Sequence, residues 1–445
     1  MSKIDWSSMY KKEDWWALWM GLIFFLLALP SYYNIYILGW IPSGVLMTPK
    51  WTNPFTAFVT IPKEIGGWGI FLLWIFLLIT LIPAAKLTGV KISSWSLGFT
   101  VIYWISILLW ILAGWAPITS AMGSPEIGFI LALLVGMVIG NIPRVPTWLK
   151  DSAKGEFFIK TAIVLLGSEI LFTVFLKTLS QILIAVFISF PIVWIFAFFV
   201  SRKIGLDRNL AATLSSGVGV CGIAAAIATA GAIGAPAIYP TMVSSLIVIF
   251  AAIELLILPI IASQIFHSNP AAAGAWMGLS VKTDGAAAAS GSVVSGLLGT
   301  DIPLKYAVMT KVMIDIWIGL IAFILACIWV YILERKPGVK VSPLVLWYRF
   351  PKFVLGYFFT SIALSSIALT YPTVSAGEAA VTPVILYGAR PLRIAFFALT
   401  FTAIGINTRF SKLKESGLGK ATIAYLIALL FAITWGGIVA YLLIH

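Results

Sequence analysis

Two ionisable residues in a glycine-rich interruption are the side chains of this sequence best placed to do chemistry. Lys282 and Asp284 lie in residues 277–289, where a short polar break separates Gly-Leu-Ser-Val from a run of alanines between long apolar stretches. An ionisable group at membrane depth is costly and marks a functional site by default. Because Lys282 carries a full positive charge, we expect it to bind a small anion, and we expect Asp284 to bind a coupling ion. The structural alternative is that the two side chains neutralise each other and hold the segment unwound.

A second interruption, residues 216–227, is also rich in glycine. Its spacing matches the dinucleotide-binding pattern Gly-x-Gly-x-x-Gly, but that pattern needs a preceding strand and an acid about 20 residues further on. The next acid is Glu254, which lies too far along the chain. We therefore interpret the glycines as positions where a helix unwinds and exposes backbone N–H groups, which suit an anion.

The two interruptions resemble each other, since each reads Gly-x-Gly/Ser-Val, then a break, then alanines. A pair of glycine-interrupted apolar segments in corresponding positions is typical of a transporter's binding site. Unwound backbone is tolerated in a membrane only where protein buries it or where it lines a cavity. We therefore predict that substrate binds between the interruptions, and the predicted binding residues are Gly217, Gly219, Cys221, Gly222, Gly278, Ser280, Lys282, Thr283 and Gly285.

Glu169 is a second candidate for binding the coupling ion. It is an isolated acid in the middle of a predicted helix, and a carboxylate in that position suits proton coupling. The alternative is a structural role, in which Glu169 pairs with Lys160 or Lys282.

Further ionisable residues are interpreted as structural. Lys311 and Asp315 are one helical turn apart, so they share a face and can pair. Glu254 lies deep in its helix and could partner Lys311. Three arginines at predicted helix ends are interpreted as anchors that extend their charge to the membrane surface; they are Arg390, Arg393 and Arg409.

The composition places these residues in an all-α integral membrane protein. Of 445 residues 61% are hydrophobic and 10% are charged, with a mean hydropathy of +1.05, whereas a soluble domain is about 45–50% apolar and about 25% charged. A transmembrane helix needs about 20 apolar residues, and the sequence predicts eleven continuous helices plus two interrupted Gly/Ala-rich segments. The continuous helices are expected at 15–38, 67–83, 95–115, 126–141, 157–176, 181–200, 238–263, 304–332, 351–370, 390–407 and 417–444, and the interrupted segments at 209–235 and 271–297.

We expect two regions, an N-terminal membrane extension at residues 1–120 with about three helices and a transporter core at residues 121–445. The extension contains a proline-containing linker at 41–66. In the core we expect a cytoplasmic connection at 334–350 and an external one at 371–388. If each interrupted segment is a re-entrant hairpin, the single helix between them makes the repeat inverted; if each crosses fully, the repeat is parallel.

The net charge of +13 is a signal of topology rather than of nucleic-acid binding. Most lysines and arginines of the predicted loops fall on the side of the N-terminus, which orients the chain with its N-terminus in the cytoplasm and its C-terminus outside. Two cysteines and two histidines predict neither a disulfide framework nor a His/Cys metal cluster. Since no nucleophile has a histidine to activate it and no phosphate loop is present, we expect no enzyme and no cofactor beyond a coupling H⁺ or Na⁺.

Five motifs follow one another at residues 136–141, 160–167, 219–226, 278–281 and 353–356. In this order they resemble the YeiH-type sulfate exporter family (UPF0324) over about residues 125–445. The resemblance implies a transporter core related in architecture to bile-acid symporters and sodium/proton antiporters, with anionic sulfur compounds as substrates. The family usually reads Ser-Ile-His-Asp-Thr-Ala-Gln where this chain reads Ser-Val-Lys-Thr-Asp-Gly-Ala, so the histidine is replaced by Lys282.

Together these patterns predict a secondary active transporter in the cytoplasmic membrane of a prokaryote. We expect it to export a small anion, such as sulfate, sulfite or an organic sulfonate or carboxylate, by alternating access around the two interruptions. One alternative is a sodium or proton antiporter that uses Asp284 and Glu169, and another is an anion channel. The expected partners are the anionic solute and membrane lipid, with no nucleic acid, and a homodimer is left open.

Overall fold

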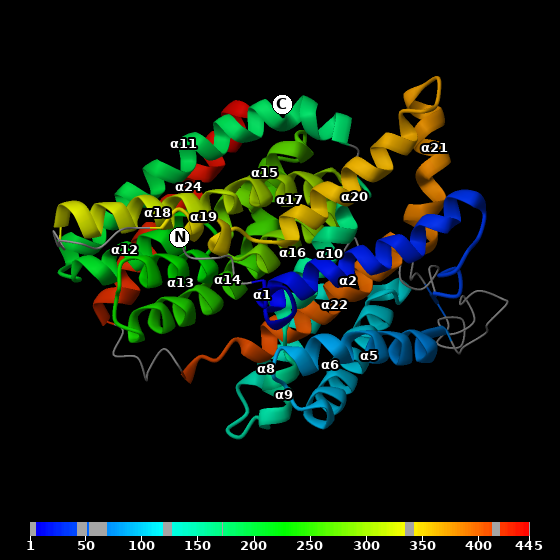
Figure 1. The fold of residues 1–445 in the computed structure, drawn as a ribbon, viewed down its shortest axis with the longest axis horizontal. Coiled ribbons are helices and arrows are strands. Elements are labelled where there is room, and N and C mark those ends of the chain that lie inside the picture. Colours follow the sequence, from blue (N-terminus) through cyan, green and yellow to red (C-terminus); the bar gives the residue numbers. More distant parts are fainter. Residues whose placement is uncertain are drawn as a thin grey trace. The chain divides into compact units, whose positions relative to one another are not determined.

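The computed structural model describes residues 6–41, 51–52, 69–118, 127–170, 172–333, 342–411 and 419–444. These residues form helices and connections, and no β-strand occurs among them (Figure 1). Eight helical segments are long and apolar enough to cross a membrane, and three further apolar helices are shorter. The prediction of an all-helical, multi-pass membrane protein is therefore confirmed.

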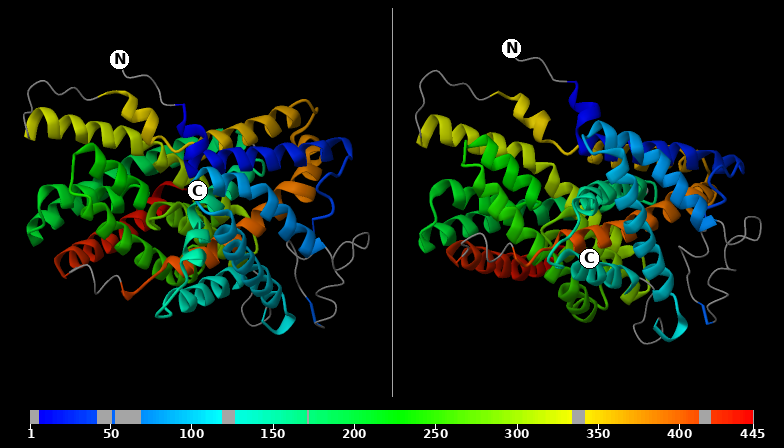
Figure 2. Two further views of the ribbon diagram at one scale, coloured as in Figure 1. Left: turned by 60° about the horizontal axis from the view of Figure 1, so that its bottom comes forward. Right: turned by 90° about the horizontal axis from the view of Figure 1, so that it is seen from below.

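Residues 1–177 and 352–408 form one compact unit, called unit 1. Its central helix is α22, which packs against α8 and α10 (Figure 2). A Cβ atom on Gly136 would lie 2.5 Å from the carbonyl oxygen of Thr402, so α8 and α22 are in backbone contact. Small residues let membrane helices approach this closely. The helices of unit 1 are α1 (Ser8–Lys11), α2 (Glu13–Ala28), η1 (Leu29–Tyr33), α5 (Gly69–Leu87), α6 (Ile92–Ala113), α8 (Ile127–Gly140), α9 (Thr147–Ser152), α10 (Gly155–Gly167), α20 (Phe353–Ala368), α21 (Val374–Val384), η4 (Ile385–Ala389) and α22 (Arg390–Asn407).

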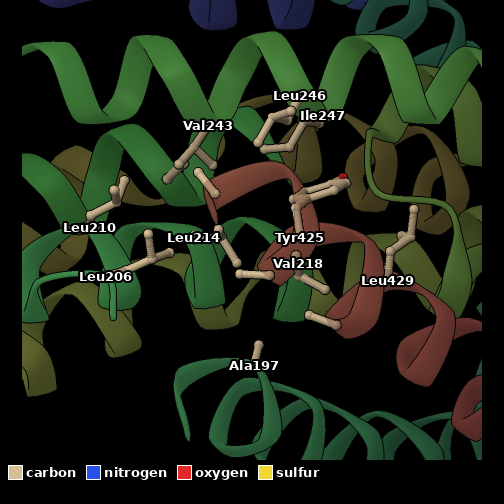
Figure 3. Packing of buried hydrophobic residues seen from close by; sticks show 14 of the residues in the cluster. Ala197, Leu206, Leu210, Leu214, Val218, Val243, Leu246, Ile247, Tyr425 and Leu429 are labelled. Carbon is tan, nitrogen blue, oxygen red and sulfur yellow. The ribbon is translucent and has the colours of Figure 1, made fainter. Parts of the chain in front are cut away.

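Residues 178–351 and 409–445 form unit 2, which contains both interruptions. A buried apolar cluster joins α11, α12, α14 and α24 in this unit (Figure 3). The division of the chain at residue 120 into an extension and a core remains a prediction. The helices of unit 2 are α11 (Phe172–Ile204), which begins in unit 1, α12 (Arg208–Gly219), α13 (Ile223–Ala232), α14 (Ile238–Ile265), α15 (Pro270–Ser280), α16 (Asp284–Leu298), α17 (Ile302–Asp315), α18 (Trp317–Cys327), η3 (Ile328–Leu333), α19 (Leu344–Arg349) and α24 (Gly419–Leu443).

At each interruption the chain of unit 2 turns back on itself. A Cβ on Gly274 of α15 would lie 2.2 Å from the Pro303 carbonyl oxygen, and a Cβ on Gly291 of α16 would lie 3.2 Å from the same atom. Two residues on opposite sides of the break therefore meet one residue of α17, so α15 and α16 run back alongside each other. Likewise a Cβ on Gly217 would touch Ala226 across the first break, at 3.7 Å. Each interruption is a helix–break–helix hairpin, and its entry into the membrane from one side remains a prediction.

Two expectations about helix boundaries are wrong. The predicted external connection at 371–388 contains α21, which Thr373 caps by accepting a hydrogen bond from the Ala376 N–H, and α21 continues through η4 into α22. The predicted helix at 157–176 is interrupted after Gly167, where the chain forms a turn at residues 168–170. Gly167 also lies against α20, since its Cβ would be 2.3 Å from the Tyr357 carbonyl oxygen.

Two predicted connections lie at least partly outside the described residues. Residues 334–341 of the predicted cytoplasmic connection lie outside the described residues, and its remainder contains α19. Most of the predicted linker at 41–66 also lies outside the described residues.

Candidate functional site

The first interruption ends α12 at Gly219 and begins α13 at Ile223. Gly222, which precedes α13, has a φ of +78°, a conformation that favours glycine. A Cβ at Gly222 would lie 2.2 Å from the carbonyl oxygen of Lys282. The two interruptions therefore touch, and only glycine satisfies both the backbone conformation and the close contact.

The second interruption separates the end of α15 at Ser280 from the start of α16 at Asp284. The hydroxyl of Thr283 accepts a hydrogen bond from the Ala286 N–H at 3.1 Å. A threonine in this position caps the helix, because it satisfies one of the N–H groups that a helix start leaves without a partner. The sequence Lys-Thr-Asp therefore stops one helix and starts the next within a few residues.

Lys311 of α17 joins the two interruptions. Its buried ammonium donates hydrogen bonds to the carbonyl oxygens of Val220 at 3.3 Å and Val281 at 2.9 Å. Both carbonyls lie at the C-terminal ends of helices, where backbone oxygens lack helical partners and carry partial negative charge. One cation thus stabilises two helix ends at once. We call the place where residues 220–222 and 281–283 meet the junction.

The backbone partners of Lys311 are contacts that the sequence analysis missed. The sequence suggested only side-chain partners for Lys311, namely Asp315 and Glu254. No sequence signal marks the two carbonyls, because they come from two other helices and any residue type supplies them.

A thiol and two carboxylates gather beside the junction. The sulfur of Cys221 and carboxylate oxygens of Asp284 and Asp315 lie within 4.8 Å of one another, and all three residues are buried. Lys311 interacts electrostatically with Cys221 in the same place. Because the Lys311 ammonium already supplies positive charge to these three side chains, we assign no metal ion to them.

Lys282 itself is buried and lies beside a small cavity. Its ammonium donates a hydrogen bond to the Leu279 carbonyl oxygen at 2.9 Å, at the end of its own helix. The cavity has a volume of about 10 Å³ and is lined by Lys282 together with Gly219, Ser189 and apolar side chains of α11, α17 and α24. A space of this size holds about one water molecule. The structure therefore brings Lys282 and Gly219 together at one small cavity, and their role in substrate binding remains a prediction.

Glu254 and Tyr425 form a further buried polar group that the sequence analysis did not place at the site. Neither carboxylate oxygen of Glu254 nor the hydroxyl of Tyr425 has a hydrogen-bond partner among the described residues. Glu254 interacts electrostatically with Lys282 and, more weakly, with Lys311. Tyr425 interacts with Glu254. The sequence paired Glu254 with Lys311, whereas Lys282 is its stronger partner.

The remaining predicted binding residues pack helices together. Gly217 lies against Val243 and Ile247 of α14, and Gly278 against Ala307 and Thr310 of α17, where a Cβ would be 2.7 Å from the Ala307 carbonyl oxygen. The Ser280 hydroxyl faces Gly436 of α24, and Gly285 is buried in the first turn of α16.

Glu169 belongs to unit 1, and its position and partners differ from those expected. It lies in the turn after α10 rather than within a helix. Its carboxylate accepts hydrogen bonds from Arg393 at 2.6 Å and from Arg390 at 2.9 Å. Lys160, one of the partners proposed for it, forms ion pairs with Asp14 and Glu156. The interpretation of Arg393 as a surface anchor is wrong, because this side chain is buried.

The chain is similar to one family and to several bacterial proteins. Residues 97–424 match the family described as Conserved hypothetical protein 698. The chain is 36% identical to UPF0324 membrane protein NE0724 of Nitrosomonas europaea over 95% of this chain and 93% of that protein. It is 33% identical to UPF0324 membrane protein RB9488 of Rhodopirellula baltica, over 82% of this chain and 65% of that protein. No solved structure matches the chain.

Proposed function

This chain belongs to the Conserved hypothetical protein 698 family of UPF0324 membrane proteins, and from that premise we propose that it is a secondary active transporter that exports a small anion. The observation that carries the proposal is the junction. Two helices are interrupted, and their breaks touch between Gly222 and the Lys282 carbonyl. A break of this kind is tolerated within a membrane only where protein or a cavity surrounds it, and paired breaks are typical of secondary transporters.

The charge beside the cavity supports an anion as the substrate. Lys282 lines the cavity, and its ammonium donates a hydrogen bond to the Leu279 carbonyl. The N-termini of α13 and α16 start at the junction, and helix N-termini carry partial positive charge. Oxyanions such as sulfate or sulfite, and organic sulfonates or carboxylates, are the class that such a site accommodates.

The hairpins support alternating access. A single helix of 28 residues, α14, connects the two hairpins. If α14 crosses the membrane once, the hairpins enter from opposite sides and the repeat is inverted, as in many transporters whose halves rock about a central site. Movement of the hairpins apart would enlarge the closed cavity and expose it to one side at a time.

A proton antiporter is the second candidate function. The close grouping of Asp284 and Asp315 with Cys221 favours it, because carboxylates at membrane depth form proton relays. In that mechanism Asp284 would carry the proton. The coupling role of Glu169 remains a prediction.

Flux in proteoliposomes tests the proposal. We expect saturable, counter-ion-dependent export of labelled sulfate or sulfite, and purified protein stabilised against heat by these anions. Linear, non-saturating anion flux would indicate a channel instead. Thermal stabilisation by cations alone, with proton movement but no anion movement, would reject anion transport in favour of the antiporter.

A further inference from the structure

Glu254 is an acid in the middle of a membrane-spanning helix. It lies in α14, five residues before Pro259, and is 4% exposed. Both of its oxygens lack a hydrogen-bond partner among the described residues. An ionised carboxylate in such surroundings is costly unless a positive charge compensates it.

The titratable groups that interact with Glu254 come from three parts of unit 2. The second interruption contributes Lys282, α17 contributes Lys311, and α24 contributes Tyr425, whose hydroxyl is buried in the cluster of Figure 3. The other acids of the unit's interior, Asp284 and Asp315, lie with Cys221 beside Lys311. Since Lys311 is shared with that group and is bonded to two backbone carbonyls, Lys282 is the cation available to Glu254.

Charge balance at Lys282 links Glu254 to the cavity on which Lys282 also lies. With Glu254 ionised, one negative charge already compensates the ammonium. An anion that enters the cavity beside Lys282 would leave two negatively charged groups, the anion and the Glu254 carboxylate, facing one ammonium in a medium of low dielectric constant, where their repulsion is large. Protonation of Glu254 removes one of the two.

We propose that an anion binds at Lys282 together with one proton, which the Glu254 carboxylate takes from solution. The proposal rests on the proposed function and specifies its coupling ion. The proton forms an O–H bond on a carboxylate oxygen, Glu254 becomes a neutral carboxylic acid, and Lys282 stays an ammonium that pairs with the anion. Release of the anion on the other side reverses both steps.

The stoichiometry has a consequence for direction. A dianion such as sulfate that moves with one proton transfers one net negative charge. A membrane potential that is negative inside drives such a charge outward, at about 2.3 kcal/mol per charge for 100 mV. This coupling is therefore compatible with export.

The test measures proton uptake on sulfate binding. Sulfate is added to the purified full-length protein in weakly buffered detergent solution near neutral pH, with a pH-indicator dye, and binding is measured in parallel by calorimetry. We expect the parent protein to take up about one proton per sulfate bound, with affinity that rises as pH falls. We expect Glu254→Gln to bind sulfate without proton uptake and with pH-independent affinity. Glu378→Gln, an exposed acid of α21, is the matched control and should behave as the parent.

The possible outcomes separate this inference from the function on which it rests. Proton uptake that persists in Glu254→Gln, or that is lost instead in Asp284→Asn, overturns the role of Glu254 while leaving anion binding intact. Sulfate binding without proton uptake in the parent does the same. Absence of binding by any tested oxyanion in the parent contradicts the proposed function itself, and the coupling with it.

A measurement on the parent protein does not depend on how the variants fold. The infrared difference spectrum upon sulfate addition should gain the C=O band of a protonated carboxylic acid. Glu254→Asp, which keeps the carboxylate, should retain both the band and the uptake. A spectrum without that band overturns the proposal.

Discussion

The two units each bury an acid with two cations, but they compensate its charge in different ways. In unit 1 Glu169 forms direct ion pairs with Arg393 at 2.6 Å and Arg390 at 2.9 Å. In unit 2 no ammonium forms an ion pair with Glu254 among the described residues: those of Lys282 and Lys311 donate to backbone carbonyls and interact with Glu254 electrostatically.

The difference separates a structural group from an exchangeable one. The guanidinium fork of arginine matches a carboxylate and forms strong, oriented hydrogen bonds, so the unit 1 group has little capacity for another ligand. In unit 2 the charges balance at a distance. Such a group can accept an anion or a proton with only local rearrangement, which is what a transport site needs.

The largest expected loss of stability comes from removing an arginine that pairs with Glu169 in unit 1. Arg393→Met removes one partner of a buried ion pair, and breaking such a pair costs about 3–5 kcal/mol. We expect the free energy of unfolding in detergent to fall by up to about that amount, since Arg390 still pairs with Glu169. Arg208→Met, at an exposed position, should be close to neutral. A change in Arg393→Met no larger than in the control would remove the distinction between the two groups.

Lys311→Met should produce the next largest loss of stability. It leaves the carbonyls of Val220 and Val281 without their donor, and a buried unsatisfied group costs about 1–3 kcal/mol. Thermal unfolding should show the loss, while Lys305→Met on the half-buried surface of the same helix should not. If Lys311→Met keeps full stability, the ammonium does not hold the two interruptions together.

Gly222→Ala should disturb the junction itself. A non-glycine residue in the left-handed region costs about 1–2 kcal/mol, and the new Cβ would also collide with the Lys282 carbonyl. Gly299 also has a positive φ, +69°, but its ψ is +26° against −118° at Gly222, and no atom lies within 4 Å, so Gly299→Ala measures the cost of an ordinary left-handed residue without the close contact. We expect Gly222→Ala to be clearly less stable than Gly299→Ala and to lose sulfate flux. Equal stability of the two variants would mean that the interruptions do not depend on close contact.

The smallest expected change in stability comes from a substitution beside Glu254 in unit 2. The hydroxyl of Tyr425 has no hydrogen-bond partner among the described residues, so Tyr425→Phe should leave the free energy of unfolding unchanged or raise it by up to about 1 kcal/mol, since a desolvated polar group is removed. Chemical denaturation measures it. A loss of stability larger than that would show that the hydroxyl has a partner, and that Glu254 is more tightly held than we infer.

The sequence predicted the class and the two interruptions because both depend on local composition. Long apolar runs give membrane helices, the glycines of residues 217–222 mark the first break, and the capping Thr283 marks the second. The ion pair between Glu169 and Arg393 joins positions more than two hundred residues apart, and the backbone partners of Lys311 belong to two other helices. Neither leaves a local pattern. The connection at 371–388 was misjudged because its prolines and polar residues are typical of a loop, whereas a threonine cap and a π-helical turn allow the helix to continue.

The most direct test of the account is sulfate binding to Lys282→Gln, measured by calorimetry beside Lys203→Gln, an exposed lysine of α11 in the same unit. Thermal unfolding and elution from size-exclusion chromatography first establish that both variants are folded. We predict that Lys203→Gln binds sulfate as the parent does and that Lys282→Gln binds at least tenfold more weakly, a loss of about 1.4 kcal/mol or more. Folded Lys282→Gln that binds sulfate as tightly as the parent would contradict the assignment of the anion site to the junction.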